Sequence, residues 1–80
     1  MDIARLISMA NQIGAFFEVE PDRAAARAGV ADHLARFWEP RMRALLLSHL
    51  DGEGGEGLKP LVSEALTEHR QRLVGRREPA

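Results

Sequence analysis

The sequence contains neither cysteine nor tyrosine. The absence of cysteine excludes disulfides, thiolate metal sites and a cysteine nucleophile. No apolar run approaches the ~20 residues of a membrane-spanning helix, and the first residues lack the basic-then-apolar order of a signal peptide. We therefore expect a complete chain that resides in the cytoplasm.

An excess of charge of either sign is also missing. The 80 residues carry 11 basic and 12 acidic side chains, for a formal net charge of -1. This balance gives no general electrostatic reason to bind nucleic acid or an anionic membrane, so we expect neither as a partner. With 45% hydrophobic and 29% charged residues, the composition is typical of one globular domain with a small core. Self-association or a larger partner would stabilise such a chain.

Proline positions and apolar spacing predict four short helices. Asp2 is a candidate N-cap of the first helix, and Pro21 is expected to end that helix and open the second. The third helix is expected to begin at Pro40 and to be capped by Gly52. The fourth is expected to begin near Pro60. No segment alternates with period two for long enough to predict a strand.

The predicted fold is all-α, a single small domain of about four short helices in a compact antiparallel bundle. The helical domain covers residues 1–74 with a Gly/Glu-rich mobile loop at 51–57, and a polar C-terminal tail follows at 75–80. Gly14 lies on an apolar helix face, where we expect another backbone to approach closely. The residues predicted to share these faces are Ile3, Leu6, Ile7, Ala10, Ile13, Gly14 and Phe17, then Arg27, Val30, Ala31, Leu34 and Phe37 with Trp38, then Met42, Leu45, Leu46, His49 and Leu50, and finally Leu58, Leu61, Val62, Ala65, Leu66, His69 and Leu73.

The three histidines show no pattern typical of a metal site or of catalysis. His33, His49 and His69 are far apart in the sequence, and no HExxH motif occurs. We interpret His49 and His69 as residues at the edge of the core, hydrogen-bonded to a neighbour. Ser48 precedes His49, but adjacent side chains on a helix point apart and cannot form a nucleophile–base pair. We expect no metal site, no catalytic residue and no independent enzyme.

Two further arrangements have simple structural explanations. Glu64 and Glu68 are four apart, as paired carboxylates could be, but we interpret them as a solvated helix face. The second and third predicted helices are close enough for a helix-turn-helix, and the third carries Arg41 and Arg43. The connection lacks the usual glycine, and the third helix is mostly apolar after Arg43, which disfavours a DNA reader.

The only tryptophan lies in the stretch FWEPRMR, residues 37–43. Together with Arg36, this stretch holds three arginines and one glutamate, a local excess of +2. Phe37 and Trp38 are consecutive on a predicted helix, about 100° apart, so both cannot point into the core. We interpret Phe37 as the core residue and Trp38 as an edge residue that offers one ring face to a partner. The predicted partner interface consists of Trp38, Arg36, Arg41, Arg43 and His33.

Two unusual strings, MANQIGAFF at residues 9–17 and HLARFWEPRMR at 33–43, precede a final apolar helix. In this order they resemble the delta subunit of cytoplasmic, NAD-dependent formate dehydrogenases, over about residues 2–73. Those enzymes carry a molybdenum or tungsten bis-pterin guanine dinucleotide cofactor. The resemblance implies a non-catalytic accessory subunit, without a redox centre, that accompanies the large catalytic subunit. It also implies a role in the assembly or stability of that subunit, or in insertion of its cofactor.

Two other hypotheses stay open beside this one. The first is a generic helical protein–protein interaction module or a homodimer unrelated to molybdenum, in which the isolated chain self-associates. The second is a small DNA-binding regulator, which would bind DNA with a steep salt dependence. No cofactor is expected to stay bound, but Arg36, Arg41 and Arg43 could hold the pyrophosphate of molybdopterin guanine dinucleotide in a transient contact.

Overall fold

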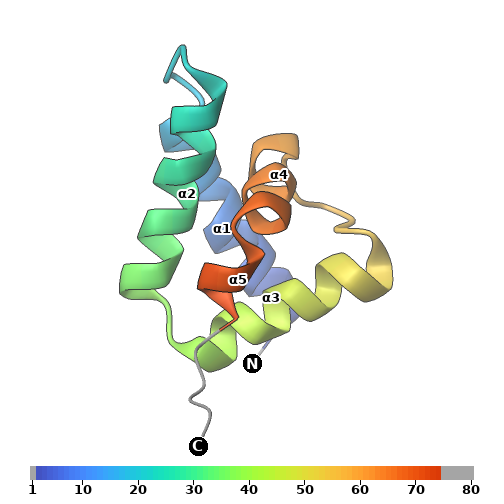
Figure 1. Ribbon diagram of the computed structural model, residues 1–80. Helices are drawn as coiled ribbons and strands as arrows, with labels where there is room; N and C mark the ends of the chain where they lie inside the picture. Colours follow the sequence, from blue (N-terminus) through green and yellow to red (C-terminus); the bar gives the residue numbers. More distant parts are fainter. Residues whose placement is uncertain (1, 75–80) are drawn as a thin grey trace, which may run out of the picture.

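The computed structural model describes residues 2–74 as five helices and their connections (Figure 1). No strand occurs among these residues, so the prediction of an all-α fold is confirmed. The predicted polar tail at 75–80 lies outside the described residues. The helices are α1 (Ile3–Phe17), α2 (Arg23–Phe37), α3 (Pro40–Glu53), α4 (Pro60–Glu68) and α5 (Arg70–Leu73).

The helix starts follow local sequence signals. Asp2 caps α1 by accepting a hydrogen bond from the Ala4 amide, and Asp22 caps α2 by accepting from the amides of the first turn. Pro40 and Pro60 occupy the first positions of α3 and α4, where the missing amide hydrogen costs nothing. All four starts therefore lie within one or two residues of the predicted positions.

Two predicted helix ends are wrong. Helix α1 ends at Phe17, four residues before Pro21, and a turn closed by the Glu20 amide on the Phe17 carbonyl reverses the chain. Helix α3 runs through Gly52 to Glu53 and is capped by Gly54, whose φ of 69° is left-handed. Glycine adopts that conformation at little cost, whereas the backbone at Gly52 is still helical, so Gly54 is the residue that stops the helix.

The helices enclose one core. In Figure 1, α1 and α2 run antiparallel, α3 lies across their lower ends and α5 lies in front. Helix α2 contacts α1, α4 and α5. The predicted fourth helix is divided at His69, whose ψ of 26° lies outside the helical range, and this break lets α5 contact α2, α3 and α4. The buried core residues are Leu6, Ala10, Ala26, Val30, Ala31, Leu34, Trp38, Leu46, Leu47, Leu61, Val62, Ala65, Leu66 and Leu73.

The buried face of α3 differs from the predicted one. We expected Leu45 on this face, but Leu45 is exposed and Leu47 is buried instead. The buried positions of the helix are Arg43, Leu46 and Leu47, so the face is rotated by about one residue. The reason is Arg43, which an apolar pattern assigns to the surface and which the structure places in the interior.

Gly14 lies where α1 and α4 come closest. A Cβ added at Gly14 would lie 2.7 Å from Cγ2 of Val62 and 3.5 Å from Cδ of Lys59. The close neighbour is therefore a side chain, whereas we had predicted a backbone. Val62 is fully buried, and as a β-branched residue it has little freedom to rotate away.

Gly14→Ala is expected to lower the free energy of unfolding by about 1–3 kcal/mol, because overpacking costs more than the gain in helix propensity. Thermal unfolding followed by circular dichroism measures the change. Gly52→Ala is the matched control, since nothing lies within 4 Å of a Cβ added there. That control is expected to gain up to about 1 kcal/mol. Stabilisation of both variants would contradict the close contact at Gly14.

Candidate partner-binding surface

The stretch around the only tryptophan is arranged opposite to our interpretation. Trp38 is 6% exposed and belongs to the core, whereas Phe37 is 69% exposed. Helix α2 ends at Phe37, and Trp38 has the extended values φ -96° and ψ 140°. The angle between consecutive helical residues therefore does not apply at this step. The extended backbone turns the indole inward, so the prediction of Phe37 as core and Trp38 as edge was wrong.

Arg43 is also internal, with only 9% of its surface exposed. Its Nη1 donates to the carbonyl oxygens of Trp38 at 2.6 Å, Ala35 at 3.2 Å and Leu34 at 3.5 Å. Its Nε donates to the carbonyl of Leu73 at 3.1 Å. The last carbonyls of a helix lack intrahelical partners and carry partial negative charge. Arg43 therefore ties the end of α2 and the end of α5 to α3.

Of the five predicted interface residues, only three reach the surface. Arg36 and Arg41 are exposed, and His33 is half-buried. The structure does not place Trp38 and Arg43 beside them at the surface, because both are enclosed by the chain itself.

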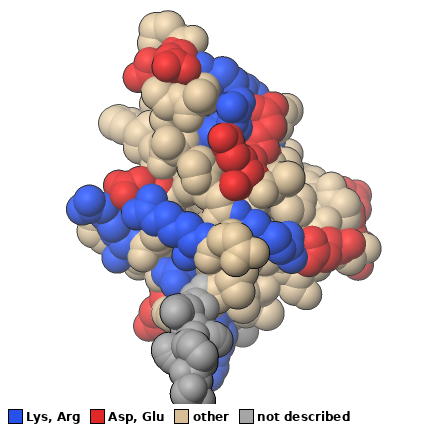
Figure 2. All heavy atoms as spheres, in the orientation of Figure 1, with Lys and Arg blue, Asp and Glu red and all other residues tan. Residues whose placement is uncertain are grey.

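The exposed arginines are mostly paired with acids. Figure 2 shows Lys and Arg side chains in a band over α5, with Asp and Glu next to them. Arg72 Nη2 lies 2.8 Å and Arg36 Nε 3.0 Å from the carboxylate oxygens of Asp32. The hydrogen bonds from Arg72 and Arg36 lower the pKa of the Asp32 carboxyl below its ordinary value. The two arginines share one carboxylate, so the acids reduce but do not cancel the positive charge of this face, which stays weakly basic.

A second set of ion pairs joins α2 to α4. Arg23 Nε lies 2.9 Å from Oε1 of Glu64, and Arg27 pairs with Glu68. The hydrogen bonds from Arg23 lower the pKa of the Glu64 carboxyl. Glu64 and Glu68 thus lie at the surface as we expected, but they cross-link two helices instead of facing solvent alone.

Of the two histidines predicted at the core edge, His49 forms the expected hydrogen bond, whereas the His69 side chain lies too far from its neighbour for one. His49 Nε2 lies 2.8 Å from the carbonyl oxygen of Glu56, which holds the loop after α3. His69 Nε2 lies 3.9 Å from Oε1 of Glu68. Among the described residues, no group of three or more His, Asp or Glu side chains is placed to hold a metal ion.

The three phenylalanines lie along the contact between α1 and α2, with Phe16 and Phe17 at the end of α1 and Phe37 at the end of the antiparallel α2. Phe16 is 71% exposed, and its ring lies edge-on to Phe17 at a centroid distance of 5.0 Å. The rings of His33 and Phe37 lie 4.8 Å apart. A shallow groove of about 290 Å³ between the two helices is lined by Ile13, Phe16, Phe17 and His33. We call the set Ile13, Phe16, Phe17, His33 and Phe37 the aromatic surface.

Helix α2 makes room for the aromatic surface at one position. A Cβ added at Gly29 would lie 2.4 Å from Cε1 of Phe17, so the Phe17 ring rests directly on that glycine. Sequence reasoning missed Phe16, although the pair Phe16-Phe17 carried a usable signal. Two consecutive residues on a helix point about 100° apart, so one of two adjacent phenylalanines must leave the core.

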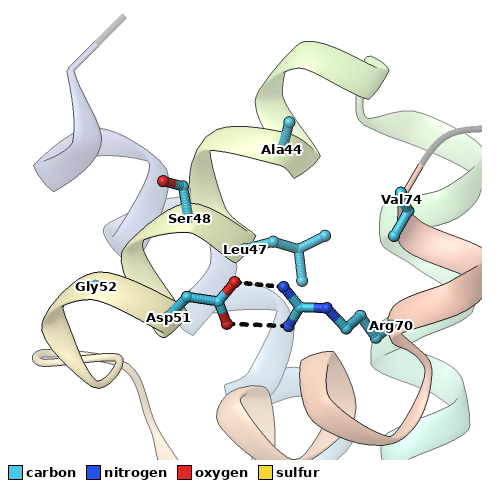
Figure 3. Close-up of a pocket in the computed structure, with 7 residues that line it drawn as sticks. All are labelled: Ala44, Leu47, Ser48, Asp51, Gly52, Arg70 and Val74. Atoms are coloured by element: carbon cyan, nitrogen blue, oxygen red, sulfur yellow. Dashed lines mark hydrogen bonds and ion pairs between the residues drawn. The ribbon is translucent and has the colours of Figure 1, made fainter.

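A second groove of about 490 Å³ lies between α3 and α5 (Figure 3). The bidentate pair of Asp51 and Arg70 crosses it, with Leu47 beside the pair and Val74 on the α5 side. Ser48 also borders the groove, but no histidine lines it. This arrangement is an ion pair that holds α5 against α3, without a nucleophile–base pair.

A family model matches residues 5–66, under the description NADH-dependent formate dehydrogenase delta subunit, FdsD. The chain belongs to this family. The matched range holds the whole aromatic surface, Trp38 and Arg43, and it ends before α5. No curated protein and no solved structure matches the chain. As a delta subunit, the chain is part of a formate dehydrogenase complex, and among its described residues no helix is long and apolar enough to cross a membrane.

Proposed function

We propose that this delta subunit is a non-catalytic accessory subunit of a cytoplasmic, NAD-dependent formate dehydrogenase. It binds the large catalytic subunit and supports the assembly or stability of that subunit. Family membership supports an association with the complex. The observation that carries a binding role is the aromatic surface, because exposed clusters of large apolar side chains are typical of protein interfaces.

We also propose that the delta subunit supports cofactor insertion indirectly. It does so by binding the catalytic subunit and not by binding the cofactor itself. Direct contact with the pyrophosphate of the guanine dinucleotide would need several free, convergent donors. Arg43 instead donates to backbone carbonyls inside the core, and Arg36 is paired with Asp32. Two of the three arginines that we predicted for this contact are therefore engaged within the chain, and exposed Arg41 by itself does not supply several convergent donors.

Removing the delta subunit from its native host is expected to reduce the amount of assembled formate dehydrogenase and the metal content of the catalytic subunit. An affinity-tagged delta subunit is expected to recover the catalytic subunit from the same host. Mass spectrometry of the captured proteins and metal analysis of the purified enzyme measure both effects. Restoring the gene for the delta subunit on a plasmid is the control.

Full assembly and full metal content without the delta subunit would contradict the proposed role. Saturable binding of the isolated cofactor to the delta subunit at about ten micromolar would contradict the proposal that it supports cofactor insertion only through the catalytic subunit. An affinity of that size requires a site on the delta subunit that binds the anionic cofactor. The homodimer hypothesis makes a different prediction, which size-exclusion chromatography of the isolated chain tests: a dimer with no captured catalytic subunit would favour it.

A further inference from the structure

We propose that the aromatic surface is the docking site for one amphipathic helix of the catalytic subunit, with a large apolar side chain of that helix seated in the groove between α1 and α2. This inference rests on the proposed function and names the surface and the kind of segment that binds there. Its starting point is the exposure of Phe16 and Phe37 on opposite helices that border the same groove.

The exposed rings leave a considerable apolar area in water. An enclosed aromatic side chain removes about 150–250 Å² from solvent, so rings that are 71% and 69% exposed leave about 100–180 Å² each. Together the two rings leave about 200–350 Å², which reaches the lower end of the largest apolar patches on typical monomers, and such patches are often functional. Phe16 contacts Phe17, Phe37 contacts His33, and the groove that Phe17 and His33 both line joins the two pairs.

Membership in a family of complex subunits favours a different, larger subunit over a second copy of this chain as the occupant. Two such rings supply at most about 350 Å², less than half of the roughly 800 Å² that each partner contributes to a stable interface. The two rings alone are therefore too small for a stable interface with any partner, so they serve as one anchor of a larger contact. A larger subunit can place an anchor there and continue its contacts beyond the rings, and membership in a family of complex subunits provides such a partner.

The charges beside the rings indicate an apolar protein segment as the occupant. Glu18 follows Phe17 and lies 3.5 Å from Nζ of Lys59, and Arg36 precedes Phe37 and pairs with Asp32. These charges are already compensated within the chain. The rim therefore does not select a nucleic acid or an anionic lipid, and association through it should depend little on salt.

The shape of the groove favours a helix. Its volume of about 290 Å³ is at the lower limit for small-molecule sites, which start near 300 Å³, and suits one large side chain. Antiparallel helices α1 and α2 border it on two sides (Figure 1). A helix laid along such a groove presents anchors at positions i, i+3 and i+4, which match a surface with rings at both rims.

The test compares binding of the intact catalytic subunit to the full-length chain and its variants. The double variant Phe16→Ser and Phe37→Ser is expected to lose at least tenfold in affinity, at low and at high salt alike. Val74→Ser is the matched control, because Val74 is 50% exposed but lies at the α3–α5 groove. The control is expected to bind like the wild type, and circular dichroism is expected to show the same helix content in all proteins.

Photo-cross-linking gives a second measurement that does not depend on the stability of the double variant. Benzoylphenylalanine at position 16 or 37 keeps an aromatic side chain and is expected to cross-link to one apolar helix of the catalytic subunit. The same probe at position 74 is expected to give no cross-link to that helix. Mass spectrometry of the cross-linked peptides identifies the segment.

The outcomes separate this inference from the proposed function. If the wild type captures the catalytic subunit and the double variant does so equally well, the docking site is wrong and the accessory role stands. Cross-links from positions 16 and 37 to a second copy of the chain would overturn the inference in favour of a homodimer. If the wild type captures no catalytic subunit at all, the proposed function and the docking site fall together.

Discussion

Replacing Trp38 by alanine is expected to unfold most of the chain at room temperature. Trp38 is 6% exposed and packs within the only core cluster of the described residues. Removal of a buried aromatic side chain costs about 3–5 kcal/mol, partly for lost burial and partly for the cavity left behind. A single core in a chain of this size supplies about the same amount in total. Circular dichroism is expected to show loss of helix and no cooperative thermal transition.

The neighbouring residue provides the control. Phe37→Ala removes a side chain that is largely exposed, so the free energy of unfolding is expected to change by about 0.5 kcal/mol or less. The two substitutions are adjacent in sequence and both remove a large ring, so they differ mainly in burial. A folded Trp38→Ala variant with an unfolded Phe37→Ala variant would reverse the assignment of the two rings.

Replacing Arg43 by alanine is expected to lower the free energy of unfolding by about 2–4 kcal/mol. The guanidinium donates to the carbonyls of Leu34, Ala35, Trp38 and Leu73. The Leu34 carbonyl also accepts from the Trp38 amide, but a buried acceptor left without any donor costs about 1–3 kcal/mol. The estimate is below the sum over four carbonyls, since water can enter the space that alanine leaves. Chemical denaturation of the purified variants measures the loss.

Two further variants separate hydrogen bonding from packing at this position. Arg43→Met keeps most of the volume without any donor, and it is expected to be destabilised nearly as much as Arg43→Ala. Arg41→Ala removes an exposed arginine two residues away and is expected to change stability by about 0.5 kcal/mol or less. If Arg43→Met were as stable as the wild type, packing of the side-chain stem would explain the role of Arg43 and its hydrogen bonds would not.

We therefore expect different residues to determine the stability of the α2–α3 corner and the binding of the catalytic subunit. Trp38 and Arg43 hold the corner from inside, whereas Phe16 and Phe37 lie outside and contribute little to the fold. Substitutions of the first pair should reduce binding only by unfolding the chain. Substitutions of the second pair should reduce binding with the helix content unchanged.

Local signals in the sequence were enough to locate the helices. Asp2 and Asp22 precede helix starts because their side chains accept hydrogen bonds from the first free amides. Pro40 and Pro60 begin helices because they lack an amide hydrogen that the first turn does not use. The apolar faces of α1 and α4 were also largely predicted, since both helices present a simple amphipathic pattern to the core.

Helical periodicity and residue type gave the wrong burial for two side chains, Trp38 and Arg43. The end of α2 at Phe37 turned Trp38 inward, and no spacing rule marks the residue at which a helix stops. Arg43 was assigned to the surface because arginine is rarely buried. Its burial depends on carbonyls from α2 and α5, which are remote in sequence from α3 and become its neighbours only in the folded chain.

The sequence by itself determined an all-α chain, the starts of its four longer helices and its resemblance to the delta subunit family, because capping, periodicity and characteristic strings are properties of short segments. Tertiary structure alone decided which side chains of the α2–α3 corner are buried and which rings meet at the surface. The aromatic surface combines Phe16 and Phe17 of α1 with His33 and Phe37 of α2. Such a surface depends on how two helices pack, and that packing is set by the whole core.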